Sequence, residues 1–259
     1  MLSRPPTTTA TSCDEGKKSG DEERERSDRW RVTDVRDEIV AACRVLSHFR
    51  IVEGFGHISA RLDHNVVITP RKALGLVTSV DELVELDPEG RQVGGSGSPP
   101  LEVQMHLAVY RRRPDVLALC RGHPRSVAAF AAAGEPIRVA HGFGTNLGAV
   151  VPVHTEPYLV TNREEGQAVA ATLGDSDGVL IQANGMLVTG QSVANACVKA
   201  IFLEETAEVQ LLARAAGLEP KAYSRDTAAR RNGNDKLHEP IRAWEYYVAA
   251  ADASGPWPA

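Results

Sequence analysis

The stretch of sequence that decides the fold is an apolar run that ends in a polar turn: Val116-Leu117-Ala118-Leu119-Cys120-Arg121-Gly122-His123-Pro124. A short apolar run bounded by turn residues is typical of a buried strand. Arg121 follows the run directly, so its guanidinium must reach a cleft or solvent, facing either a substrate carboxylate or a structural ion-pair partner. The sequence therefore predicts a central strand that ends at Arg121 and His123.

Helical and strand patterns alternate on both sides of this run. Apolar spacing predicts helices at Asp34–Phe49, Ser126–Ala133, Arg163–Leu173 and Val193–Ala216, another opened by Glu102, and a last one at His238–Ala251 after a polar linker, Arg230–Lys236. Short strands are expected at Ile58–Arg61, Val66–Thr69, Val84–Leu86, Ala149–Val153, Gly178–Gln182 and Met186–Thr189. This order predicts α+β or α/β/α layers in one domain.

Length, composition and charge narrow the class of protein. The chain has 259 residues, 42 % of them hydrophobic, so it can bury a core without disulfides. Its net charge of -5 argues against nucleic-acid or anionic-membrane partners, and no apolar stretch is long enough to span a bilayer. The four cysteines form no CxxC pair, which suits a reducing cytoplasm. Residues 1–29 are polar and predict a disordered tail, followed by a domain at 30–259.

Several side chains are candidates for chemistry. Glu102 lies at a loop-to-helix junction, where it either projects into a cleft or complements the helix dipole. His123 ends the buried strand and is either a metal or acid–base residue or a solvated loop histidine. His141 lies in a glycine-rich turn. His106, four residues after Glu102, is expected to hydrogen-bond that glutamate or to lie on the outer face of the helix.

Other common catalytic motifs are absent from the sequence. No GxGxxG follows a strand, and no GxxxxGK[ST] phosphate loop or GxSxG elbow occurs. Nucleotide-dependent redox chemistry and serine hydrolysis are therefore not expected.

Four blocks, in order, resemble the class II aldolase/adducin family. They are Gly56-His57-Ile58-Ser59-Ala60-Arg61, then Ile68-Thr69-Pro70, then Glu102 with His106 and Arg113-Pro114-Asp115, and finally Gln182-Ala183-Asn184-Gly185 before a long helix. The resemblance covers roughly residues 30–218. It implies an α/β/α fold with a central mixed β-sheet, helical layers on both faces and a homotetramer with active sites at subunit interfaces.

The resemblance also implies site residues. Glu102 falls on the acid/base glutamate of the family, and His123 on one of its metal-binding histidines. The other two histidine positions hold Arg121 and Asn184, so a divalent ion (Zn, Mn or Fe) would have to be held by His123 and His141 with water. Expected substrate-binding residues are Gly56, His57, Ser59, Thr69, Pro70 and Asn184. Because His57 and Pro100-Leu101 replace the usual phosphate-binding residues, a phosphorylated substrate is not favoured.

The sequence is also similar to the branch of this family that contains decarboxylases of hydroxylated aromatic or heteroaromatic dicarboxylates. Decarboxylation and aldol cleavage both leave a carbanion that needs an electron sink and a proton. We therefore predict a carbon–carbon lyase acting on a small hydroxylated carboxylate, with Glu102 transferring the proton and Arg121 orienting the carboxylate. Two alternatives stay open: a non-catalytic assembly module of the adducin type, and a metal-independent biosynthetic enzyme.

Overall fold

The computed structural model of the chain describes residues 34–234 and 240–254. The tail that the sequence predicts as disordered, residues 1–29, lies outside this part. From residue 34 onward the chain forms one compact unit. No helix in these ranges is long and apolar enough to cross a membrane.

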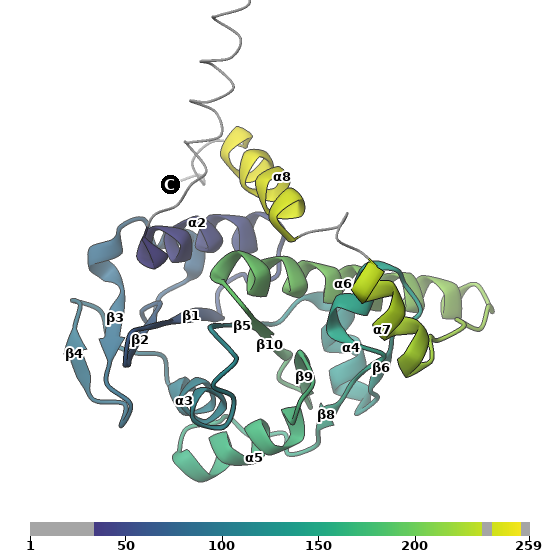
Figure 1. The fold of residues 1–259 in the computed structure, drawn as a ribbon, viewed down its shortest axis with the longest axis horizontal. Helices are drawn as coiled ribbons and strands as arrows, with labels where there is room; N and C mark the ends of the chain where they lie inside the picture. Colours follow the sequence, from purple (N-terminus) through teal and green to yellow (C-terminus); the bar gives the residue numbers. More distant parts are fainter. Residues whose placement is uncertain (1–33, 235–239, 255–259) are drawn as a thin grey trace, which may run out of the picture. The chain divides into compact units, whose positions relative to one another are not determined.

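The centre of the molecule is an eight-stranded sheet (Figure 1). Its strands, in spatial order, are β4 (Gln92–Gly94), β3 (Val84–Leu86), β2 (Asn65–Ile68), β1 (His57–Leu62), β5 (Ala118–Gly122), β10 (Met186–Gly190), β9 (Gly178–Ile181) and β8 (Val153–His154). Each neighbouring pair is antiparallel except β8 and β9, which run parallel. The sheet is therefore mixed, as the sequence predicted. A separate two-stranded sheet pairs β6 (Ile137–Arg138) with β7 (Val150–Val151).

Helices cover both faces of the central sheet (Figure 1). One layer holds α3 (Val103–Arg112) and α5 (Arg163–Leu173), which pack against each other. The opposite layer holds α2 (Val35–His48), α4 (Arg125–Ala133), α6 (Val193–Ala215) and α8 (Pro240–Ala253). The last helix, α7 (Arg225–Asn234), packs against the 3-10 helix η3 (Phe143–Leu147). The predicted α/β/α class is confirmed.

Strand β5 is the buried centre of the sheet, and its alternation of side chains positions the site. Leu119 lies in the core that α3 and α5 cover, whereas Cys120, one residue later, points to the other face. Arg121 is two residues after Leu119, so it faces the same side as Leu119. In the antiparallel register Arg121 pairs with His57 on β1 and with Leu187 on β10. The charged side chain of Arg121 therefore lies close to Glu102, at the start of α3.

Several expectations about local structure were wrong. The strand expected at Ala149–Val153 is two strands, β7 and β8, which belong to different sheets. The predicted linker Arg230–Lys236 is helical over residues 230–234, because α7 continues to Asn234 and residues 235 and 236 lie outside the described part. Its charged side chains gave no apolar period, since the helix buries little of its surface apart from Ala228. The strand β4 was not expected either, because its three residues are exposed or half-buried and run into a glycine-rich loop.

Candidate active site

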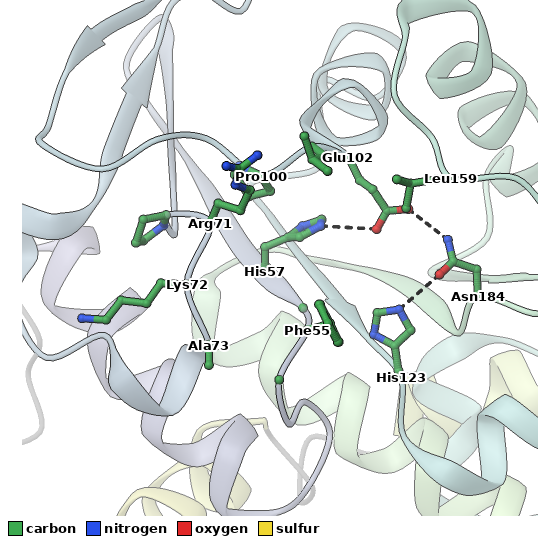
Figure 2. A pocket seen from close by; sticks show the side chains of 14 residues that line it. Phe55, His57, Arg71, Lys72, Ala73, Pro100, Glu102, His123, Leu159 and Asn184 are labelled. Atoms are coloured by element: carbon green, nitrogen blue, oxygen red, sulfur yellow. Dashed lines mark hydrogen bonds and ion pairs between the residues drawn. The ribbon is translucent and has the colours of Figure 1, made fainter. Parts of the chain in front are cut away.

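A cavity of about 460 Å³ opens beside the start of β1, the end of β5 and the start of α3. This volume lies in the range of small-molecule sites. Its walls are formed by fourteen residues, which we call the Glu102 pocket: Gly54, Phe55, Gly56, His57, Pro70, Arg71, Lys72, Ala73, Pro100, Leu101, Glu102, His123, Leu159 and Asn184 (Figure 2). They come from six separate stretches of the chain, so the pocket is made only by folding.

Glu102 is the residue in this pocket with the most polar contacts. It occupies the N-cap position of α3, but its side chain makes no capping hydrogen bond. Its carboxylate instead accepts a hydrogen bond from Nδ2 of Asn184 at 2.9 Å, and Oε2 lies 3.4 Å from Nη2 of Arg121 and 3.7 Å from Nε2 of His57. The side chain is only 7 % exposed. This geometry favours the reading in which Glu102 serves a cleft over the reading in which it complements the helix dipole.

The surroundings of Glu102 keep its carboxylate ionised. Burial alone raises the pKa of Glu102, but the contacts with His57, Arg121 and Asn184 lower it to about 2. At neutral pH the resting site therefore holds a carboxylate that accepts protons, not a carboxylic acid that donates them.

Asn184 links Glu102 to His123 (Figure 2). Because its Nδ2 donates to the carboxylate, its Oδ1 must be the atom that faces Nε2 of His123, at 3.3 Å. Oδ1 only accepts, so Nε2 carries the proton and Nδ1 of the neutral imidazole keeps a lone pair. Nδ1 is buried beside the backbone of Phe55 and makes no well-aligned hydrogen bond within the described residues. His123 therefore lines the pocket as a ring whose Nε2 is held by Asn184.

Two features maintain this arrangement. Burial, together with the charge of Arg121, lowers the pKa of His123 to about 4, so the imidazole is neutral at physiological pH. Asn184 lies in a tight turn in which Gly185 has φ +82°. A Cβ at Gly185 would lie 2.3 Å from the carbonyl oxygen of Gly122, so only glycine allows the two strands to approach this closely.

Arg121 is fully buried and does not line the pocket. Its Nη1 donates to the carbonyl oxygens of Gly122 and Met186, at 2.8 and 3.3 Å. Its Nη2 forms the ion pair with Glu102 but no aligned hydrogen bond, and Nε has no hydrogen-bond partner. This placement supports the ion-pair alternative for Arg121, and it does not support direct contact with a substrate carboxylate.

The other predicted site residues divide into two groups. Gly56, His57, Pro70 and Asn184 line the pocket together with Glu102 and His123, so the structure brings them together as expected. Ser59 and Thr69 are fully buried and absent from the pocket walls, because Ser59 bonds to His106 and Tyr110 while Thr69 accepts from the backbone of Ile58. Direct substrate contact by Ser59 and Thr69 is therefore not supported.

His141 lies away from the pocket. It precedes η3, its ring packs edge-on against Phe143 with centroids 5.1 Å apart, and it does not line the Glu102 pocket. Burial and the neighbouring Arg231 lower its pKa. The structure does not bring His141 to His123, so it does not support the metal-binding pair that the sequence suggested.

Several functional candidates were missed from the sequence. Phe55, Arg71, Lys72 and Leu159 line the pocket although no motif marked them. A signal was present for Arg71 and Lys72, which follow the block Ile68-Thr69-Pro70 directly. His106 neither bonds to Glu102 nor lies on the outer face of α3: it is fully buried and contacts His57 and Ser59.

The donor set does not fit the divalent metal site that the family resemblance implies. Within residues 34–234 and 240–254, no three side chains of the His, Cys, Asp or Glu type cluster closely enough to hold an ion. Arg121 also places a fixed positive charge 3.4 Å from the carboxylate that such an ion would need. We therefore derive the chemistry of the site from its own side chains.

The chain is similar to known decarboxylases and aldolases. The chain is 34 % identical over 198 residues to a 3,4-dihydroxyphthalate decarboxylase of Arthrobacter keyseri, covering 70 % of this chain and 79 % of the relative. It is 31 % identical over 231 residues to a 3,4-dihydroxyphthalate decarboxylase of Terrabacter sp. (strain DBF63), covering 83 % and 95 %. An L-fuculose phosphate aldolase of Methanocaldococcus jannaschii is 22 % identical over 178 residues, covering 68 % and 96 %.

Solved structures show the same fold. An L-fuculose 1-phosphate aldolase superimposes with a TM-score of 0.72 at 23 % identity, over 78 % of this chain and 96 % of that one. An aldolase II superfamily protein from Pseudomonas syringae gives a TM-score of 0.73 at 23 % identity, over 89 % and 98 %. The family model "Class II Aldolase and Adducin N-terminal domain" matches residues 37–211, which is more than half of the chain. The chain belongs to the class II aldolase and adducin family, and within that family it is a carbon–carbon lyase.

Proposed function

We propose that this lyase decarboxylates a small hydroxylated aromatic carboxylate, with Glu102 as the group that transfers the proton. The observation that carries the proposal is the ionised carboxylate of Glu102 in the pocket, joined through Asn184 to a neutral His123. A carboxylate that accepts protons suits a substrate with a hydroxyl group. The two relatives named 3,4-dihydroxyphthalate decarboxylase support an aromatic substrate of this class.

The walls of the pocket suit a flat, anionic molecule. Phe55, Leu101 and Leu159 present apolar surface, and their side chains are 82, 54 and 49 % exposed. Arg71 and Lys72 add positive charge at the other end of the labelled residues from His123 and Asn184 (Figure 2). A ring that carries two carboxylates would thus place one of them on the side of these cations and the other, which leaves, nearer to Glu102.

The proposed reaction begins when Glu102 accepts the proton of a substrate hydroxyl. Electron density then moves from the oxygen into the ring, and Glu102 returns the proton to the ring carbon that bears the carboxylate. The carbon–carbon bond breaks, its electron pair restores the aromatic ring, and carbon dioxide leaves. One proton from water completes the hydroxylated product.

The low pKa of free Glu102 makes it a weak base, but an incoming substrate changes this. A carboxylate brought next to Glu102 is a like charge, and like charges raise the pKa of the group they approach. The proton affinity of Glu102 therefore rises in the enzyme–substrate complex, where the proton must be accepted and returned. Arg121 and Asn184 limit this rise, so the proton remains easy to give back.

The decisive experiment compares the wild type with Glu102→Gln on hydroxylated phthalates and on sugar phosphates, with release of carbon dioxide and of aldehyde measured separately. We expect carbon dioxide release by the wild type and a loss of about 10²–10⁴-fold in Glu102→Gln, the range typical of a general acid–base residue. Glu85→Gln is the matched control, because Glu85, which lies on β3, pairs with Arg36 of α2 and does not line the pocket. Equal turnover by wild type and Glu102→Gln, or aldehyde release alone, would refute the proposal.

We also propose the homotetramer and the cytoplasmic location that the sequence suggested. The apolar rim of the pocket supports an assembly, because a neighbouring subunit would cover the exposed Phe55, Leu101 and Leu159. Light scattering coupled to size-exclusion chromatography measures the assembly directly. A monomer at micromolar concentration with full activity would contradict it.

A further inference from the structure

Behind Glu102, a line of buried polar side chains connects β1 to α3. Nδ1 of His57 lies 2.7 Å from Nε2 of His106, and Nδ1 of His106 lies 2.6 Å from Oγ of Ser59. Oγ of Ser59 lies 2.9 Å from Oη of Tyr110. At the other end, Nε2 of His57 lies 3.7 Å from Oε2 of Glu102. The four side chains beyond Glu102 are 5 % exposed or less, so water does not replace these contacts.

Donors and acceptors in this line fit one consistent direction. The carboxylate of Glu102 carries a negative charge and only accepts, so at 3.7 Å it favours the form of His57 in which Nε2 carries the proton and Nδ1 keeps its lone pair. Nε2 of His106 then donates to that lone pair, which leaves Nδ1 of His106 as the acceptor for the hydroxyl of Ser59. Oγ of Ser59 in turn accepts from the hydroxyl of Tyr110. Each of the three hydrogen bonds in the line then joins one donor to one acceptor.

The direction requires both histidines to be neutral, and their surroundings make them so. Burial lowers the pKa of His57, and the charge of Arg121 acts in the same sense against the opposing effect of Glu102. Burial, His57 and Arg121 lower the pKa of His106. Each ring therefore carries one N–H, and a change of tautomer in one ring would force a change in the other.

At the end of the line far from Glu102, Tyr110 is held by its position on α3 and by the guanidinium of Arg61. Tyr110 lies on α3 one turn after His106, and burial raises the pKa of its hydroxyl, which therefore stays protonated as a donor. The guanidinium of Arg61 stacks on the ring of Tyr110, with its Cζ 4.7 Å from the ring centroid. These contacts leave the hydroxyl of Tyr110 aimed at Ser59.

We propose that His106, held by Ser59, is a positioning residue that fixes His57 as the Nε2–H tautomer facing Glu102. In this role His106 never touches the substrate. It ensures that the ring of His57 offers a proton, not a lone pair, to the carboxylate that transfers protons in the pocket. The inference rests on the proposed function only in taking Glu102 as that carboxylate.

Nitrogen-15 NMR of the full chain with labelled histidine tests the tautomers without any substrate. Long-range proton–nitrogen correlations separate a protonated ring nitrogen from one with a lone pair, and His57→Gln and His106→Gln variants assign the signals among the eight histidines. We expect His57 and His106 each to show one neutral, Nε2–H form between pH 6 and 8. An Nδ1–H form of His57, or a doubly protonated ring, would overturn the inference even if the enzyme proves to be a decarboxylase.

A variant series separates positioning from packing. Ser59→Ala removes the donor to His106, so we expect mixed tautomers in both rings, a roughly tenfold fall in kcat, as for the loss of one buried hydrogen bond, and a KM within twofold of wild type. Ser59→Thr restores the hydroxyl and should restore the single tautomer. Thr206→Val removes a different buried hydroxyl, which donates to the carbonyl oxygen of Phe202 within α6. This variant should change neither the tautomers of the two histidines nor kcat.

Two results would contradict the inference. One is a Ser59→Ala protein with a single Nε2–H tautomer and wild-type kcat. The other is a fall in kcat that Thr206→Val reproduces, which would indicate a general loss of stability. Should Ser59→Ala fail to fold, Tyr110→Phe removes the next donor along the line, and the wild-type spectrum alone still decides the tautomer of His57.

Discussion

Nη2 of Arg121 lies 3.4 Å from Oε2 of Glu102, and neither side chain is more than 9 % exposed. The pair results from the register of β1 and β5, which puts Arg121 opposite His57, and from the position of Glu102 at the start of α3. Because the guanidinium has no access to the pocket, its effect on a substrate must pass through Glu102. Arg121 thus holds a fixed positive charge beside Glu102, at a position where the family resemblance expects a metal-binding histidine.

Replacing Arg121 should change the pH dependence of the enzyme. In Arg121→Gln, burial would dominate at Glu102 and raise its pKa from about 2, and the pKa of His123 would rise from about 4. Both groups act in their deprotonated forms. The acid limb of kcat/KM should therefore move from near pH 4 upward by about one unit or more. Initial rates from pH 4 to 8 measure the shift.

The same variant should lose stability in a pH-dependent way. The pKa of Glu102 is depressed in the folded state, so the ion pair stabilises the fold above about pH 4.5 and this contribution is lost as the pH falls towards 2. Arg121→Gln should thus unfold more easily at pH 7, by about 3–5 kcal/mol, and the difference should shrink in acid. Arg36→Gln, which breaks the half-buried pair with Glu85, is the control. In the kinetic experiment, an acid limb of kcat/KM that is unchanged in Arg121→Gln would show that Arg121 does not set the pKa of Glu102.

Much of the fold could be predicted because local pattern and tertiary packing agree. The periodicity of α2 and α6 matches the faces they bury against the sheet, and Asp34 caps α2 through a hydrogen bond from Arg36 N. By contrast, α7 is polar on most of its surface and β4 is a short edge strand, so neither carries a strong period.

The site was only partly predictable, for a different physical reason. Glu102, His123 and Asn184 stand at ends of elements, where sequence position limits what they can face. Whether Arg121 reaches the pocket depends on strand register, and the contact of His106 with His57 joins residues 49 positions apart. His141, like His123, lies next to a glycine after an apolar stretch. In the fold, however, His141 lies beside η3, whereas His123 follows the central strand β5.

Asn184→Asp tests the bridge between Glu102 and His123. The new carboxylate would stand where Nδ2 now donates to Glu102 at 2.9 Å, and two adjacent carboxylates raise the pKa of at least one of them. We expect activity below pH 6 to fall about tenfold or more, with partial recovery at higher pH as both groups ionise. Asn162→Asp is the control, since Asn162 caps α5 outside the pocket. A variant with the wild-type pH profile would show that Asn184 is only a wall of the pocket.

Arg71→Ala tests whether the exposed cations of the pocket bind the second carboxylate of the substrate. Arg71 lines the pocket, and Lys72 beside it already lies 2.5 Å from Glu82, so Arg71 is the better candidate for a second carboxylate. We expect KM for a hydroxylated dicarboxylate to rise about tenfold, as for one charge-assisted hydrogen bond, while KM for the matching monocarboxylate changes little. Arg138→Ala, an exposed arginine on β6, should alter neither. Equal effects on both substrates would place the second carboxylate elsewhere.

Removal of divalent ions should leave the enzyme active. Arg121 and Asn184 occupy two of the three positions at which the family resemblance expects histidine ligands, and His141 lies outside the pocket. The remaining imidazole, His123, donates through Nε2 to Asn184, and a single nitrogen ligand binds a dication weakly. After dialysis against a chelator we expect kcat/KM within about twofold of the untreated protein, and elemental analysis should find well under one ion per chain. Loss of activity that zinc or manganese restores, with one ion bound per chain, would mean that substrate binding rearranges Arg121 away from Glu102.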